Sequence, residues 1–272
     1  MKVVPVAMIG AVAVFLCGGV LAAPAALKTW TEPNTGMVFV AVPKGCFQMG
    51  TSVKEIGKVD ASLKVFQSTL AADEVPQHEV CVDAFLMSQT EVRASDWFKV
   101  TGDHPPYGKD AAPAAGISFV AAQDFASSLT KMSGGSFQFR LPTEAEWEYA
   151  CRAGIKKQAM PFRDDQIDSA WYSVEQKRTA QPSPVGVLKP NAWGLFDMLG
   201  NVWEWVQDGY AQTAYVKHVL YNPLHTATSS DARVIRGASY RSDYIQLRCA
   251  NRSSYAPNDS LVQIGMRLVR QP

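Results

Sequence analysis

Two acidic residues that flank a Gly-Asn pair are the strongest candidates for chemistry in this sequence. Asp197 and Glu204 stand on either side of Gly200-Asn201, a pair that is typical of a turn. Such a turn can bring both carboxylates together and direct backbone carbonyl oxygens to the same side. Ca²⁺ takes about six to eight oxygen ligands of these two kinds. The segment therefore favours a structural calcium site, and the alternative is a turn with two solvated acids.

The cysteines are the next candidates, and their chemistry depends on how the chain begins. A signal peptide is predicted at residues 1–22. Its typical features are the basic Lys2, an apolar stretch from Val3 to Val20 and the small residues that follow. A membrane anchor is the alternative, but the apolar run is short and no basic cluster follows it. We therefore expect Cys17 to be removed with the signal peptide. The mature protein should be periplasmic or secreted and have no membrane span.

Four cysteines then remain, and an even number in an exported chain predicts two disulfides. They are Cys46, Cys81, Cys151 and Cys249. No two of them have the CxxC spacing of a zinc site. Their spacing alone leaves all three possible pairings open.

Charge and composition exclude several classes of function. Without residues 1–22 the chain has 25 basic and 25 acidic residues, and no basic run, which argues against nucleic acid as a partner. The four histidines are scattered without an HxH or HxxxH pair, and the chain has no GxSxG or P-loop sequence. The hydrophobic share of 47% is enough for a packed core.

The elements that must position these residues are short. Ser118 caps a helix through Met132, and Thr143 with Glu146 forms a capping box for a helix through Arg152. Ser95 can cap a third, short helix through Val100. Loops are expected at 51–76, 101–116 and 154–192, and strands at 37–43, 45–50, 78–87, 234–239, 247–251 and 263–269. The pattern predicts one α+β domain at residues 23–272, since no linker composition divides it.

Four segments, in this order, resemble the formylglycine-generating enzyme, or sulfatase-modifying factor, family. They read VPKGCFQMG (42–50), RLPTEAEWEYACR (140–152), NAWGLFDMLGNVWEW (191–205) and RGASY…RCANRSS…IGMR (236–267). The similarity covers about residues 37–269, nearly the whole mature chain. It implies a C-type lectin-like fold with a twisted antiparallel sheet, two main helices and much irregular structure.

The resemblance also implies disulfides and calcium ligands. In the family, the cysteine after the LPTEAEWEYA helix pairs with the one in the RCAxR segment, which implies Cys151–Cys249 here and leaves Cys46 to Cys81. The family binds calcium through side chains at the positions of Asp197 and Glu204 and carbonyls at those of Gly200 and Val202. A second family calcium site finds no matching ligands near residues 170–179.

The catalytic segment departs from the family. The oxidase has two cysteines shortly after its GGS(Y/W) strand, and their thiolates bind copper(I). Here those positions fall on Ser242 and Tyr244, so copper is not expected, and no catalytic residue is carried over. The walls of the family's groove should remain. Its candidate residues, of which Trp203 and Arg252 also suit a structural role, are Trp203, Ser239, Arg241, Ser242, Asp243, Tyr244, Arg252, Ser253, Asn258 and Asp259.

Three functions follow from this reading. The first is a calcium-stabilised binding or accessory protein that holds a peptide, protein or small molecule in a remodelled groove. The second is an oxidoreductase of the pyoverdine-maturation type, with Tyr244, Asp243 and Asp259 as the groups to test. The third, a true formylglycine-generating oxidase, would require Cys249 or Cys46 as a free thiol. We rank them in this order, and the sequence leaves open whether the protein is an enzyme.

Overall fold

The computed structural model describes residues 27–52, 72–155, 181–229 and 231–271. The expected signal peptide, most of the expected loop at 51–76 and the second family calcium site near 170–179 lie outside these residues. In the part of the chain that is described, no helix is long and apolar enough to cross a membrane.

Most of the strands form two sheets. The five-stranded sheet has the order β1 (Thr29–Thr31), β2 (Val38–Val42), β5 (Phe85–Ser88), β11 (Val269–Arg270), β6 (Phe139–Arg140), and all its pairs are antiparallel. The four-stranded sheet has the order β10 (Ile264–Gly265), β7 (Trp203–Gly209), β8 (Arg233–Arg236), β9 (Arg252–Tyr255), and only the β10–β7 pair is parallel. A separate antiparallel pair joins β3 (Gly45–Met49) to β4 (His78–Val82).

Three α-helices are described, and two begin where the capping residues predict. Helix α4 (Phe119–Met132) starts after Ser118, whose hydroxyl accepts a hydrogen bond from the Ala121 amide. Helix α5 (Glu144–Arg152) starts with the predicted capping box of Thr143 and Glu146. Helix α3 (Ala94–Thr101) is capped by Arg93, two residues before the predicted cap Ser95, and the Asp96 side chain accepts from the Arg93 backbone and guanidinium.

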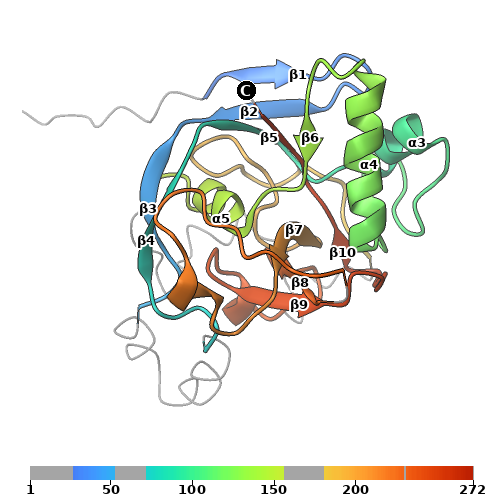
Figure 1. Cartoon of the computed structure of the whole chain (residues 1–272). Helices are drawn as coiled ribbons and strands as arrows, with labels where there is room; N and C mark the ends of the chain where they lie inside the picture. Colours follow the sequence, from blue (N-terminus) through green and yellow to red (C-terminus); the bar gives the residue numbers. More distant parts are fainter. Residues whose placement is uncertain (1–26, 53–71, 156–180, 230, 272) are drawn as a thin grey trace, which may run out of the picture.

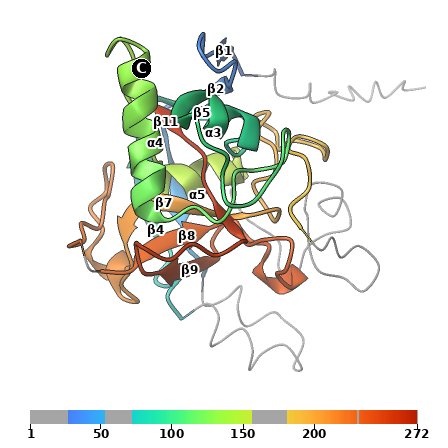
Figure 2. The same ribbon diagram turned by 90° about the vertical axis from the view of Figure 1, so that its right-hand side faces the viewer.

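The helices have different places in the molecule. Helices α3 and α4 pack together at one side, while α5 lies in the interior between the five-stranded and the four-stranded sheets (Figures 1 and 2). Every residue of α5 is therefore buried, including its three glutamates. The mixed α+β architecture agrees with the predicted fold class, but it distributes its strands over more than one sheet.

Four predicted strands differ from the structure. The expected strand 78–87 divides at the exposed Asp83, which pairs with the Asn222 side chain, and its halves β4 and β5 join different sheets. Residues 234–239 stop being a strand at Gly237, whose φ of 94° is left-handed. The expected strands 247–251 and 263–269 are also wrong in extent. Turns precede β9, and the last segment divides into β10 and β11.

Both expected disulfides are present. Cys46 and Cys81 are opposite one another on β3 and β4, and their sulfur atoms are bonded. Cys151, at the end of α5, is bonded to Cys249, which lies shortly before β9. The second bond therefore joins the interior helix to the segment that carries the predicted groove residues.

Candidate functional site

The predicted calcium ligands lie on a turn that enters β7. Asp197, Gly200 and Asn201 all have positive φ angles, of 53°, 96° and 56°, so the backbone is tightly folded. The Asp197 carboxylate accepts a hydrogen bond from the Gly186 amide at 2.6 Å, and the Gly200 amide donates to the Gly237 carbonyl at 2.7 Å. The turn is thus held at a fixed distance from residues 183–186 and from the loop that follows β8.

Glu204 is already bonded to two side chains. The Arg267 guanidinium donates to both of its carboxylate oxygens, at 2.7 and 2.8 Å, and the Trp147 indole N–H donates at 2.6 Å. A carboxylate can accept about four hydrogen bonds, so Glu204 retains limited capacity for a cation. All three side chains are buried, and the group ties β7 to helix α5 and to the residues before β11.

A third acidic residue, Glu91, lies near these two and was not a candidate from the sequence. It is 1% exposed, and the charges of Asp197 and Glu204 both act on it. Burial, and then the charge of Asp197, raise the pKa of Glu91 well above its ordinary value. Glu91 follows β5 and precedes α3, far in the sequence from Asp197. No motif in the sequence indicated that it lies near the turn, because only the fold brings the two segments together.

The residues of this turn fit calcium in kind. They supply carboxylate and carbonyl oxygens and no soft ligand, which is the preference of Ca²⁺. Among the described residues, no three side chains of the His, Cys, Asp and Glu types already converge on one point. The oxygen atoms that this turn offers to a calcium ion are those of the Asp197 carboxylate, the carbonyls of Gly200 and Val202 and the remaining capacity of Glu204.

The loop after β8 contains the positions where the family has its copper-binding cysteines. Ser239 and Ser242 are buried and close a tight turn: the Ser242 hydroxyl accepts from the Ser239 amide at 3.0 Å, and the Ser242 amide donates to the Ser239 carbonyl at 2.9 Å. The Ser239 hydroxyl accepts from the Arg241 amide. Both hydroxyls therefore support the loop, while the side chains of Arg241 and Asp243 are exposed. The side chain of Tyr244 lies outside the described part of the structure.

The other predicted groove residues are spread over several environments. Trp203, the first residue of β7, is in the core, and Arg252 is in a buried ion-pair network. Ser253 is opposite Ile235 in the β8–β9 pair. Asn258 is exposed, and the Asp259 carboxylate closes its own turn by accepting from the Ala256 amide. The exposed part of the predicted surface is therefore centred on Arg241 and Asp243.

Buried ion pairs fix the frame beneath this loop. Arg236 on β8 donates to Glu144 and Glu148 on α5, at 2.9 and 2.6 Å, and Arg252 on β9 donates to Glu144 at 2.6 and 3.0 Å. Burial alone would raise the pKa of Glu144, but Arg252 and Arg236 outweigh it and hold the pKa below its ordinary value. At the next turn, Arg248 donates to both carboxylate oxygens of Glu74.

A histidine pair lies beside this network. The ring nitrogens Nε2 of His78 and Nδ1 of His218 are 3.1 Å apart, and Nε2 of His218 is buried without a partner in the described structure. The pKa of His218 is lowered to about 4, mainly by burial. Glu144 opposes this shift, and the charges of His78, Arg252 and His225 add to it. His218 therefore resists protonation in the folded protein.

This pKa predicts a loss of stability in acid. Between the ordinary histidine pKa of about 6.5 and a folded value of about 4, the unfolded chain binds a proton that the folded chain does not, so stability falls as the pH falls. Because the ring is partly exposed, we expect His218 to contribute about 1–2 kcal/mol to this loss. Urea unfolding at about pH 7 and about pH 4.5 should show a smaller pH effect in His218→Gln than in the wild type.

The matched control is His104→Gln, which removes an exposed histidine stacked on Phe98. It should retain the pH dependence of the wild type. An equal acid effect in all three proteins would contradict the role of His218.

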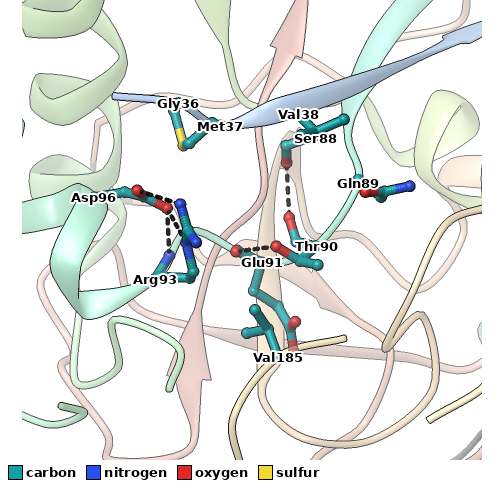
Figure 3. Close-up of a pocket in the computed structure, with 10 residues that line it drawn as sticks. All are labelled: Gly36, Met37, Val38, Ser88, Gln89, Thr90, Glu91, Arg93, Asp96 and Val185. Atoms are coloured by element: carbon teal, nitrogen blue, oxygen red, sulfur yellow. Dashed lines mark hydrogen bonds and ion pairs between the residues drawn. The ribbon is translucent and has the colours of Figure 1, made fainter. Parts of the chain in front are cut away.

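Two cavities of the described structure lie in other parts of the surface. One, of about 190 Å³, lies between β2, the end of β5 and the start of α3, and Figure 3 shows its residues, including Glu91 and the Arg93–Asp96 ion pair. The other, of about 450 Å³, lies between the Cys46–Cys81 hairpin and the end of α5, where Phe47 and Tyr149 are in contact. Neither is lined by a predicted groove residue.

Comparison with known proteins identifies the family. The sulfatase-modifying factor enzyme 1-like domain matches residues 25–272. Formylglycine-generating enzymes of Streptomyces coelicolor and Mus musculus are 36% and 33% identical over 143 residues, which is 47% of this chain and 45% and 38% of those proteins. The chain thus matches less than half the length of these relatives. The structure of PvdO from Pseudomonas aeruginosa is 27% identical with a TM-score of 0.76, covering 90% of this chain and 98% of that one. The chain belongs to the sulfatase-modifying factor, or formylglycine-generating enzyme, family.

Proposed function

We propose that this protein is an exported member of the family that lacks copper oxidase activity and acts as a calcium-stabilised binding or maturation protein. The observation that carries the proposal is the use of its cysteines. All four cysteines of residues 27–272 are in disulfides, and Ser242 and Tyr244 are at the positions of the copper-binding pair. A hydroxyl group does not replace a thiolate as a copper(I) ligand.

The loop from Ser239 to Asp243 is the proposed binding surface. Its backbone is fixed by the Ser239–Ser242 turn and by the Tyr240 amide, which donates to the Asn201 carbonyl. Arg241 and Asp243 extend from it into solvent as one positive and one negative group. A rigid loop with exposed charges suits a polar ligand, such as a peptide or a small molecule, because little ordering is needed on binding.

The proposal predicts the thiol and metal content of the purified mature protein. Titration with a thiol reagent under denaturing, non-reducing conditions should detect no free thiol, because both cysteine pairs are oxidised. Metal analysis after dialysis against calcium should find about one Ca²⁺ per chain and no stoichiometric copper, as expected for an oxygen-only site. A family member that retains the cysteine pair, loaded with copper(I) in the same way, is the control.

The outcomes separate the parts of the proposal. Stoichiometric copper or two reactive thiols would overturn the loss of oxidase chemistry. Absence of bound calcium, with no free thiol and no copper, would overturn only the calcium site at Asp197.

The second candidate is an oxidoreductase of the pyoverdine-maturation type. The observation that favours it is the similarity to PvdO, which covers nearly the full length of both chains, whereas the formylglycine-generating enzymes match only part of it. A stoichiometric redox metal in the purified protein, or oxygen consumption that Tyr244→Phe or Asp243→Asn reduces, would support this candidate over a binding protein.

A further inference from the structure

Strand β3 has an outer edge whose backbone groups point away from its partner β4. The Cys81 amide donates to the Leu220 carbonyl, and the Cys81 carbonyl accepts from the Asn222 amide, so the backbone polar groups of Cys81 point away from β3. Cys46 is opposite Cys81 in this antiparallel pair, and its own amide and carbonyl must therefore point away from β4. Pairs of this kind alternate along the ladder, so Gln48 has the same direction.

This edge of β3 is open among the described residues. Its sheet consists of β3 and β4, and no other described backbone group bonds to the amide or carbonyl of Cys46 or Gln48. The pairing runs in continuous register from Gly45 to Met49, with neither a bulge nor a proline, which are devices that protect edge strands. The disulfide from Cys46 to Cys81 fixes the two strands to one another. The edge is therefore a rigid template on which another strand can pair with little ordering of the protein.

The cavity of about 450 Å³ lies beside this edge, where β3 and β4 run along one side of the molecule next to α5 (Figure 1). Cys46 and Gln48 both line it, together with the apolar side chains of Phe47, Tyr149 and Ile155. The rings of Phe47 and Tyr149 are 5.3 Å apart, and Ile155 is 48% exposed. The volume is in the range of about 300–1,000 Å³ that is typical of ligand pockets. A strand added to β3 would place a side chain against these apolar walls.

The charged side chains of the cavity favour a basic partner. Two of the lining residues are charged, Arg152 and Glu79. Arg152 is 5% exposed and is ion-paired with Glu148 at 2.6 Å. Glu79 is exposed, is opposite Gln48 in the β3–β4 pair and has no ion pair in the described structure. The lining therefore presents one uncompensated negative charge, which a lysine or arginine of a bound segment would complement.

We propose that the β3 edge binds an extended peptide segment of a partner protein as an added strand, with a large apolar side chain in the cavity and a basic side chain beside Glu79. The outward groups of Cys46 and Gln48 are about 6.8 Å apart along the strand, which is the interval at which an extended peptide repeats its own amides and carbonyls. Main-chain hydrogen bonds would supply affinity, and the cavity and Glu79 would supply specificity. This surface shares no residue with the loop from Ser239 to Asp243 and does not depend on the function proposed for that loop.

Peptide selection followed by an N-methyl scan tests the proposal on the intact, oxidised protein. Random peptides of about seven residues, the length of an ordinary strand, are displayed on phage and selected on the immobilised protein. The most enriched peptide is then synthesised with a fluorophore, and its Kd is measured by fluorescence anisotropy. N-methylation of one peptide amide at a time should raise the Kd about tenfold at alternate residues only, because only those amides face the carbonyls of Cys46 and Gln48.

Matched variants of the protein place the peptide on β3. Gln48→Pro removes an outward amide and should raise the Kd about tenfold, whereas Gln48→Ala keeps the amide and should bind within about twofold of the wild type. Glu79→Gln should raise the Kd about two- to fivefold, with a smaller effect in high salt.

Two results would overturn the proposal: a selection that yields no binding peptide, or a peptide that Gln48→Pro binds as the wild type does. If Gln48→Pro does not fold, the N-methyl scan on the wild type decides, because an effect at every position or at none excludes strand pairing.

Discussion

Replacing Arg236 with methionine is expected to destabilise the protein by about 3–5 kcal/mol, the usual cost of removing one partner from a buried ion pair. Arg236 is fully buried and donates to Glu144, to Glu148 and to the carbonyls of Ala250 and Cys249. Methionine fills a similar volume but leaves two buried carboxylates with less compensation. The loss therefore comes from the remaining charges and not from a cavity.

Chemical unfolding of the folded, oxidised protein measures this effect. The matched control is Arg241→Met, because Arg241 is exposed on the loop that follows the same strand and such a change is usually worth less than about 0.5 kcal/mol. Arg236→Lys should fall between the two, since a single ammonium cannot bond both carboxylates as the planar guanidinium does. A loss below about 1 kcal/mol in Arg236→Met would mean that water or rearrangement compensates the two glutamates.

The sequence predicts best where local chemistry decides the structure. Ser118 and Thr143 satisfy the first amides of α4 and α5 within a few residues, so both helix starts are visible in the sequence. Cys151–Cys249 could not be chosen from spacing, and the family resemblance supplied it. The division of residues 78–87 was missed because β4 and β5 are individually strand-like, and their separate partners β3 and β2 are distant in the chain.

The candidate site shows the same limit. Asp197 and Glu204 are recognisable because one turn contains both, whereas Glu91 becomes visible only through burial without a partner. Arg252 has the same residue type as Arg241, but the fold places it 5% exposed among Glu144, Tyr210 and Tyr215, while Arg241 faces solvent. Sequence motifs identify which residues the family retains, and they do not distinguish a retained ion pair from a ligand contact.

Removing the Cys151–Cys249 disulfide with the double variant Cys151→Ala/Cys249→Ala is expected to cost about 5 kcal/mol. The bond closes a loop with a sequence separation of 98, and the chain-entropy estimate for such a loop is about 4.7 kcal/mol. The corresponding variant of Cys46 and Cys81, whose separation is 35, should cost about 4 kcal/mol. Chemical unfolding of each purified variant measures both losses.

The position of the bond predicts a second, local effect that chain entropy alone does not. The Cys249 carbonyl accepts from Arg236, and Arg248 beside it is paired with Glu74, so the bond fixes the segment that follows the proposed binding loop to helix α5. Amide hydrogen exchange in residues 237–251 should therefore become faster when Cys151 and Cys249 are replaced, and should stay unchanged when Cys46 and Cys81 are replaced. Equal exchange in this loop in both variants would show that the ion pairs alone hold it, and the disulfide would then stabilise the fold without shaping the binding surface.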